Sequence, residues 1–166
     1  MTEQSARWGF PLLQAGQAQK ELFHNEALAR IDVIAQAVAE AAGVDTPPGD
    51  PAPGACWVIG DSPAGEWSGR ARHLAGWTEG GWRFVAPVEG MTVWLADRGV
   101  PARFLGGEWT VGELRGDCLK VAGKQVVGAR RPAIPGPAGG AVIDVEARTA
   151  INAILETMRA HGAIEP

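Results

Sequence analysis

The stretch GWTEGGWRFV, residues 76–85, decides the fold of this chain. Two tryptophans, Trp77 and Trp82, flank a turn that contains Gly80 and Gly81, and glycine is the residue that adopts a positive φ without steric cost. Aromatic and β-branched residues on both sides of such a turn are typical of short strands. The stretch therefore predicts a β-hairpin.

The same pattern recurs towards the C-terminus. In MTVWLADRGVPARFLGGEWTVG, residues 91–112, glycine-containing turns are expected at Arg98-Gly99 and at Gly106-Gly107, and a Trp again follows a turn. CLKVAGKQVV, residues 118–127, is a further hairpin candidate with its turn near Gly123. We therefore predict an antiparallel meander.

Two Pro/Gly-rich stretches divide the chain into three parts. They are GVDTPPGDPAPG, residues 43–54, and GARRPAIPGPAGG, residues 128–140, and their prolines favour extended, semi-rigid spacers. The expected parts are an N-terminal segment and helix (1–43), a Trp-rich antiparallel β domain (55–128) and a C-terminal helix (141–166). The predicted fold class is α+β.

The N-terminal part predicts a helix from Asn25, as its N-cap, to Ala42, with Gly43 just beyond its end. Its apolar residues repeat at alternating spacings of three and four, the pattern of a coiled-coil seam. Upstream, residues 8–23 carry large apolar side chains in a segment too short to bury them alone. The candidate interface residues of this part are Trp8, Phe10, Leu12, Leu13, Leu28, Ile31, Ala35 and Val38.

The C-terminal part predicts a second helix, from Asp144 as N-cap to His161, closed by Gly162. The three-four spacing of its seam adds Ile151, Ile154 and Met158 to the candidate interface. A lone helix of this length is marginal in water, so it needs a partner. The two seams together favour a homo-oligomer, of a symmetry that they leave open.

Composition and charge exclude several classes of protein. The 166 residues carry a net charge of -4 and three scattered lysines, which gives no general attraction to nucleic acid. The N-terminus has no signal-peptide pattern and no stretch is apolar enough to insert into a membrane, so synthesis in the cytoplasm is expected. Cys56 and Cys118 are expected to be buried, reduced thiols, although a bridge between them stays open.

The sequence offers little for catalysis. It has three histidines and three serines, no nucleophile motif, no phosphate-binding loop of correct spacing, no metal cluster and no cofactor motif. A small glycan hydrolase remains the weakest alternative, with its two acids drawn from Asp61, Glu66, Glu79 and Asp97. We expect a protein that is not an enzyme.

The tryptophans are the most informative residues of the β domain. Most are expected to anchor the core, but strand alternation makes it hard to direct all of them to one core. An exposed indole on a rigid hairpin can stack on a sugar ring. The candidates for stacking on a glycan are Trp67, Trp77, Trp82, Trp94 and Trp109.

Three stretches carry a resemblance to a known family. GQAQKELFHNEALARID (16–32) and GEWSGRARHLAGWTEGGWRFVAPVEGMTVWLAD (65–97) resemble an uncharacterised domain family of alphaproteobacterial phages, prophages and gene transfer agents. LKVAGKQVVGARRPAIP (119–135), followed by GGAVIDVEARTAINAILETMRAHGAI (139–164), resembles the closing segment that accompanies it in fibre and spike proteins.

The resemblance implies a structural component of a virion or gene-transfer-agent particle, and no catalytic residue. We expect a head-spike base or adaptor, or a tail-fibre subunit, that contributes to host attachment. Its partners would be capsid or tail proteins, a distal fibre protein and host polysaccharide. The alternative is a carbohydrate-binding module that recognises host surface polysaccharide.

Overall fold

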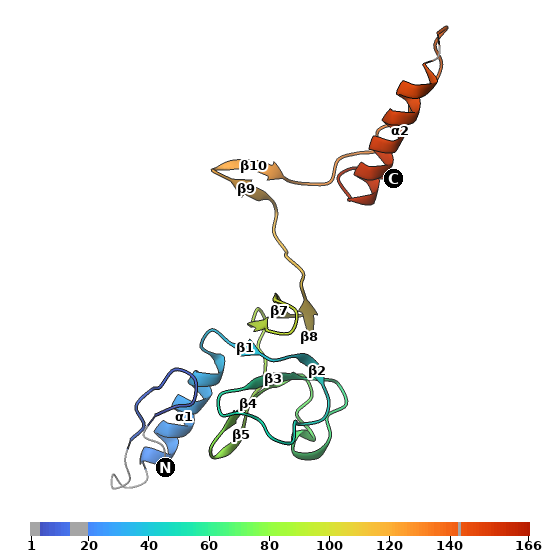
Figure 1. Cartoon of the computed structure of the whole chain (residues 1–166). Helices are drawn as coiled ribbons and strands as arrows, with labels where there is room; N and C mark the ends of the chain where they lie inside the picture. The colour runs from blue at the N-terminus through green and yellow to red at the C-terminus, as the bar shows by residue number, and fades with distance from the viewer. Residues whose placement is uncertain (1–3, 14–19, 143) are drawn as a thin grey trace. The chain divides into compact units, whose positions relative to one another are not determined.

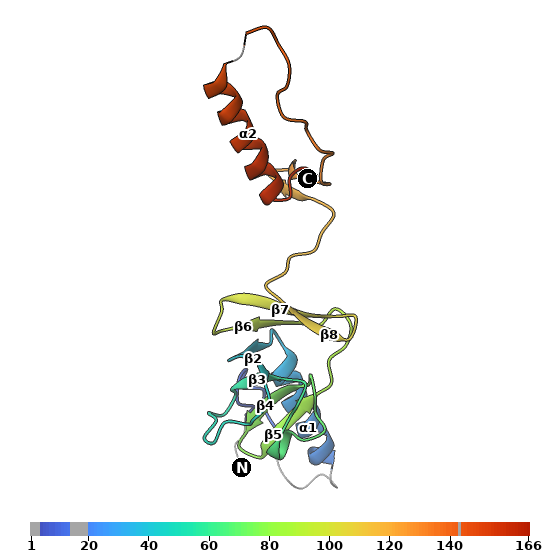
Figure 2. The ribbon, with the colours of Figure 1, turned by 90° about the vertical axis from the view of Figure 1, so that its right-hand side faces the viewer.

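The computed structural model describes residues 4–13, 20–142 and 144–166. The chain forms two compact units, Met1–Glu113 and Leu114–Pro166. Among the described residues, each unit contains one α-helix and at least one antiparallel hairpin, which confirms the predicted α+β class (Figures 1 and 2). No helix within these described ranges is both long and apolar enough to cross a membrane.

The first sheet of the N-terminal unit has the order β2-β3-β4-β5. Its strands are β2 (Ala42–Val44), β3 (Cys56–Ile59), β4 (Leu74–Thr78) and β5 (Gly81–Val85). The hairpin predicted from residues 76–85 joins β4 and β5, with Trp77 opposite Trp82 and Thr78 opposite Gly81. Gly81 has a φ of 93°, a conformation that favours glycine, which accounts for its place after the turn.

The second sheet has the order β1-β6-β7-β8, where β1 is Val38–Ala39, β6 Thr92–Leu95, β7 Val100–Leu105 and β8 Glu108–Val111. The strands β6, β7 and β8 form the predicted antiparallel meander. The β1–β6 and β2–β3 pairs, however, are parallel. The strands that make these parallel pairs, β1 and β2, lie outside residues 55–128, the range predicted as an antiparallel domain. Within that range the described strand pairs are all antiparallel. β1 and the first residue of β2 come from the segment predicted as helix.

The N-terminal helix is shorter at its C-terminal end than the sequence predicted. It is α1, Lys20–Ile34, so the predicted end at Ala42 is wrong and Val38 and Ala42 lie in β1 and β2. Asn25 is not the N-cap but lies inside the helix, where its side chain exchanges two hydrogen bonds with the backbone of Leu13 at 2.9 and 3.0 Å. The helix ends at Ile34, and Gln36, two residues further on, adopts a left-handed φ of 44° that a continuing helix would not allow.

The main core of this unit lies between the two sheets and α1. Val58 and Leu74 of the first sheet, Val93 and Leu95 of the second, and Val33 of α1 are all buried in it. In Figures 1 and 2, α1 runs beside β4 and β5. The helix approaches so closely at Gly76 that a Cβ there would overlap the side chain of Val33.

The opposite face of the first sheet carries a layer of aromatic residues. Trp57, Trp77 and Trp82 project from β3, β4 and β5, and the short 3-10 helix η1 (Gly65–Trp67) brings Trp67 onto them. The ring centroid of Trp82 lies 5.7 Å from that of Trp57, 5.1 Å from that of Trp67 and 4.9 Å from that of Trp77, with edge-to-face inclinations that aromatic rings favour. A second buried core therefore forms on this side of the sheet.

The C-terminal unit has little buried apolar surface. It contains the hairpin β9 (Leu119–Val121) and β10 (Lys124–Val127), and the helix α2 (Val145–Ala160). The predicted N-cap of α2 is confirmed, because Asp144 Oδ1 accepts the Ala147 N–H at 2.8 Å. Within the described part of this unit, the buried apolar side chains are those of Leu155 and Ile164.

The two Pro/Gly-rich stretches belong to these units instead of separating three parts. Residues 43–54 return to the first sheet, where the Gly54 N–H donates to Trp77 O at 2.8 Å. Residues 128–140 run along α2, where Arg159 donates to Ile134 O at 2.7 Å. The boundary between the units follows Glu113, inside the range 55–128 predicted as one domain.

Candidate functional site

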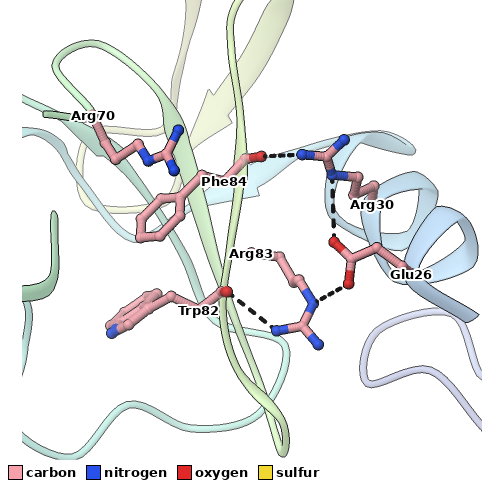
Figure 3. A pocket seen from close by; sticks show the side chains of 6 residues that line it. All are labelled: Glu26, Arg30, Arg70, Trp82, Arg83 and Phe84. Carbon is pink, nitrogen blue, oxygen red and sulfur yellow. Dashed lines mark hydrogen bonds and ion pairs between the residues drawn. The ribbon is translucent and has the colours of Figure 1, made fainter. Parts of the chain in front are cut away.

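A recess of about 180 Å³ lies between α1 and the free edge of β5 (Figure 3). Six of the described residues line it, and we call it the arginine recess: Glu26, Arg30, Arg70, Trp82, Arg83 and Phe84. β5 is the terminal strand of its sheet, so among the described strands its outer edge has no neighbour. The recess therefore combines an open strand edge with three guanidinium groups.

Strand alternation distributes the side chains of the recess. Trp82 and Phe84 project from one face of β5, while Arg83 projects from the other, towards Glu26 and Arg30 of α1 (Figure 3). Glu26 and Arg30 are four residues apart on α1, so they lie on neighbouring turns of one helix face. One strand thus presents aromatic rings on one side and positive charge on the other.

A single carboxylate serves two of the three arginines. Arg83 Nε lies 2.7 Å from Glu26 Oε2, an ion pair without the alignment of a hydrogen bond, and Arg30 Nε lies 3.5 Å from Glu26 Oε1. Arg30 also donates to Phe84 O at 3.4 Å, on the free edge of β5. With one carboxylate for three guanidinium groups, the lining carries a local charge of about +2 in a chain whose net charge is -4.

Arg70 supplies the third guanidinium group. Its Cζ lies 5.3 Å from the centroid of the Phe84 ring, within the range of a cation–π interaction. In the described ranges of the chain, no carboxylate lies within ion-pair distance of Arg70. This side chain is exposed and holds its charge beside an aromatic ring.

The structure separates the five tryptophans that were candidates for glycan stacking. The choice of Trp67 as a glycan-stacking candidate is corrected, because its side chain is 0% exposed and offers no face to a ligand. Trp77 and Trp82 are half-buried neighbours in the aromatic layer, and Trp82 lines the arginine recess. Trp94 is 48% exposed on the outer face of the second sheet, and Trp109 packs edge-to-face on Phe104 with centroids 5.4 Å apart. The five side chains do not form one surface.

Trp109 lines a second cavity, of about 210 Å³, between β3 and β8. Its Nε1 donates to Arg72 O at 2.7 Å, and Arg72 in turn lies 2.6 Å from Asp61 and 3.5 Å from Glu108. The hydrogen bond to Asp61 raises the pKa of Arg72 above its ordinary value. The charges here are satisfied within the protein, so the arginine recess is the better ligand site.

The acids considered for hydrolysis are not gathered at either cavity. Of Asp61, Glu66, Glu79 and Asp97, Asp61 alone lines one of the two, and it is paired with Arg72. Among the residues whose positions are given, no three His, Cys, Asp or Glu side chains form a group that could hold a metal ion.

The predicted N-terminal interface divides into residues that pack on this chain and residues that stay exposed. Phe10, Leu12, Leu28 and Ala35 are half-buried, whereas Trp8, Leu13, Ile31 and Val38 are exposed. Trp8 nevertheless donates its indole N–H to Ala35 O at 2.9 Å, beside the end of α1. Residues 14–19, which include the QAQ of the stretch GQAQKELFHNEALARID that carries the family resemblance, lie outside the described residues.

Sequence reasoning missed the two residues that fix this segment, Arg7 and Asp32. Asp32 is 3% exposed and accepts hydrogen bonds from Ser5, Arg7 and Trp8, while the Arg7 guanidinium donates to the carbonyls at the end of α1. One signal was available, because an aspartate inside the apolar run ARIDVIA is unusual unless it has partners.

The predicted C-terminal seam lies on one face of α2, since its residues recur at spacings of four, three and four. Ala147, Ile151 and Ile154 are exposed on this face, with Ile151 at 44% and Ile154 at 59%, and Met158 is half-buried. The neighbouring face, which carries Leu155 and Arg159, is the one that residues 128–140 follow. The seam itself faces solvent.

The expectation that both cysteines are buried, reduced thiols is right for Cys56 and wrong about the burial of Cys118. Both thiols are free, but Cys56 is buried in the main core and Cys118 is exposed in the other unit. Burial raises the pKa of the Cys56 thiol to about 11.

Comparison with known proteins gives one family. The family described as "Protein of unknown function (DUF2793)" matches residues 24–110, just over half of the chain. This range includes most of α1 and nearly all of both sheets, and therefore all six residues of the arginine recess. No curated protein matches the chain. The chain belongs to the DUF2793 family, whose function is unknown.

Proposed function

We propose that this chain is a non-enzymatic structural subunit of a phage-like or gene-transfer-agent particle, and that it self-associates through its C-terminal unit. The observation that carries the association is the exposed apolar seam of α2. The sequence resemblance to alphaproteobacterial phage, prophage and gene-transfer-agent proteins supports the particle.

The C-terminal unit buries too little to be stable alone. A single helix of 16 residues is marginal in water, and so is an isolated two-stranded hairpin. In the hairpin, Leu119, Val121, Val126 and Val127 are all exposed. Because both elements leave apolar side chains in water, a partner that covers them would supply the missing core.

A second copy of the same helix is the partner that the seam fits best. Ala147, Ile151, Ile154 and Met158 keep the three-four spacing at which helices pack knobs into holes. Burying a large aliphatic side chain contributes about 1.5 to 3 kcal/mol, so burying Ile151 and Ile154 would supply several kcal/mol per chain. A symmetric assembly buries the seam of every copy at once.

The N-terminal unit would be the part that contacts the particle. The exposed side of α1 carries Phe23, Ala27 and Ile34, which recur at helical spacing, and Phe23 is 80% exposed. Exposed apolar side chains that share one helix face can form a surface for a protein–protein contact. We infer that α1 docks on a capsid or tail protein, while the C-terminal unit joins copies to one another or to a distal fibre.

Light scattering or native mass spectrometry of the purified chain tests the association. The full chain is expected to be oligomeric at micromolar concentration, and Ile154→Asp is expected to shift it to monomer. Ala153→Asp is the matched control, because it places the same charge on the same helix, away from the seam. A wild-type monomer, or equal effects of the two substitutions, would overturn self-association through α2.

Particle incorporation is a separate test. Particles from a producing strain are compared by electron microscopy with particles from the same strain lacking this gene, and an epitope-tagged copy is located by gold labelling. Missing spikes or fibres, with label at their position in the complemented strain, would support the proposal. Intact particles that carry no label would refute it.

A second candidate function is a carbohydrate-binding module. The observation that favours it is the arginine recess, where an aromatic side chain lines an open cavity beside groups that can donate hydrogen bonds. Binding of oligosaccharides to the purified chain, measured by calorimetry, tests it. The two functions are compatible, because a spike or fibre subunit can both assemble and attach.

A further inference from the structure

We propose that the arginine recess binds a carboxylate-bearing sugar unit of an acidic polysaccharide. The inference rests on the second candidate function and adds to it the chemical class of the ligand and the arginines that recognise it. It is independent of self-association through α2.

The charge of the recess points to an anion. Its lining has three guanidinium groups and one carboxylate, in a chain with four more acidic than basic charges overall. Such an excess of like charge costs free energy unless a counter-charge relieves it, and a bound carboxylate would provide one. Planar guanidinium groups bind carboxylates through paired, charge-assisted hydrogen bonds.

Arg70 is the residue best placed to receive that anion. Arg30 and Arg83 share Glu26, whereas Arg70 meets no carboxylate among residues 4–13, 20–142 and 144–166. Its guanidinium group is held beside the Phe84 ring at 5.3 Å, which leaves its N–H groups available for a ligand. A residue that is already positioned loses less side-chain entropy on binding.

The aromatic residues favour a sugar over a bare anion. Trp82 and Phe84 line the same recess and project from one face of β5, as Figure 3 shows. The apolar face of a sugar ring can pack on such side chains while its carboxylate reaches the arginines. A small inorganic anion would use the arginines alone and gain nothing from these rings.

The open edge of β5 supplies further polar groups. Phe84 O accepts a weak hydrogen bond from Arg30 at 3.4 Å, so this carbonyl faces the recess and not a neighbouring strand. Carbonyl oxygens of this kind can accept hydrogen bonds from sugar hydroxyls. The recess therefore offers charge, an apolar surface and acceptors within one cavity.

Binding of an oligogalacturonate to the full-length chain, measured by calorimetry at low salt, tests the inference. A neutral oligosaccharide of equal length is the ligand control. Arg70→Gln is expected to weaken oligogalacturonate binding about tenfold, because it removes one charge-assisted contact. Arg103→Gln is the matched control, since Arg103 lies in β7 of the other sheet, and it is expected to leave binding unchanged.

Glu26→Gln provides a test of opposite sign. Its carboxylate competes with a bound anion for Arg30 and Arg83, so removing its charge is expected to tighten oligogalacturonate binding severalfold. Circular dichroism and thermal unfolding verify that each variant keeps the fold. Tighter binding by Glu26→Gln together with weaker binding by Arg70→Gln would establish recognition of the carboxylate.

The other outcomes separate the inference from the function on which it rests. Equal binding of the neutral oligosaccharide, insensitive to Arg70→Gln, would overturn the acidic ligand while retaining a carbohydrate-binding module. Equal binding of polyglutamate or of single-stranded DNA would overturn the sugar, since these anions lack its apolar ring face. Binding to none of these ligands would overturn both.

Discussion

The carboxylate of Asp32 accepts the main-chain N–H of Trp8 at 2.7 Å, which fastens the N-terminal segment to the last turn of α1. The same carboxylate accepts the Arg7 N–H at 2.8 Å and the Ser5 hydroxyl at 2.7 Å. Arg7 completes the connection, because its guanidinium donates to Asp32 O at 2.6 Å and to Val33 O at 3.0 Å. A buried charge is tolerated here because its hydrogen bonds are made.

Asp32→Ala is therefore expected to lower the free energy of unfolding by about 3 kcal/mol. Each hydrogen bond to a charged group contributes about 1.5 to 3 kcal/mol, and water replaces some of the bonds that the variant loses. Urea denaturation measures the change. Asp97→Ala is the control, because the exposed pair of Asp97 with Arg98 at 3.8 Å is expected to contribute less than about 1 kcal/mol. Equal effects of the two substitutions would show that Asp32 does not hold the segment.

Gly76→Ala is expected to destabilise the N-terminal unit by about 1 to 3 kcal/mol, because the added methyl group would overlap Val33 and push α1 from the sheet. Thermal unfolding measures this loss. Gly49→Ala is the control, since its Cβ would meet nothing within 4 Å. Val33→Ala makes room for the added methyl group, so the double variant should lose less stability than the sum of the losses in the two single variants. A loss larger than that sum would contradict the close approach.

Trp67→Ala is expected to cost about 3 to 5 kcal/mol, because this side chain is fully buried against Trp57 and Trp82. Trp94→Ala, by contrast, should cost less than about 1 kcal/mol, since about half of its side chain is already in water. Chemical denaturation of both variants measures the difference. Similar losses would mean that the aromatic layer does not centre on Trp67.

Local signals in the sequence predicted the elements whose causes are local. The hairpin of residues 76–85 follows from its glycine-containing turn, and α2 follows from Asp144 and Gly162 at its two ends. In both cases the residues that determine the element lie within it or beside it. The seam of α2 could be predicted for the same reason, because helical spacing alone places its side chains on one face.

The end of α1 and the sorting of the tryptophans could not be predicted in this way. Residues 35–42 keep an apolar pattern that is compatible with a helix. The helix nevertheless ends earlier, where Arg7, far away in the sequence, donates hydrogen bonds to the carbonyls of Asp32 and Val33. Beyond this end, Ala37 and Ala39 are buried in the main core. Trp67 is buried because a 3-10 turn folds onto the sheet. The arginine recess likewise joins residues from a helix, a loop and a strand, which no spacing reveals.

The two thiols are expected to differ in reactivity. Cys118 is exposed, whereas Cys56 is buried and its pKa is raised to about 11, so its thiolate is both inaccessible and scarce at neutral pH. Iodoacetamide should therefore label the native chain at Cys118 alone, and both cysteines after denaturation, as measured by peptide mass spectrometry. Rapid labelling of Cys56 in the native chain would contradict its place in the core.

Burial of Cys56 should also make the stability of the N-terminal unit depend on alkaline pH. Between about 9, the ordinary pKa, and about 11, the unfolded chain loses the Cys56 proton while the folded chain keeps it. The unfolded state then binds fewer protons, so the free energy of unfolding falls as the pH rises through this range, by at most about 1.4 kcal/mol per pH unit. Denaturation at successive pH values should show a shallower decline for Cys56→Ala than for the wild type. Cys118→Ala should keep the wild-type decline, because its thiol is exposed in both states, and parallel curves for all three proteins would exclude a contribution from Cys56.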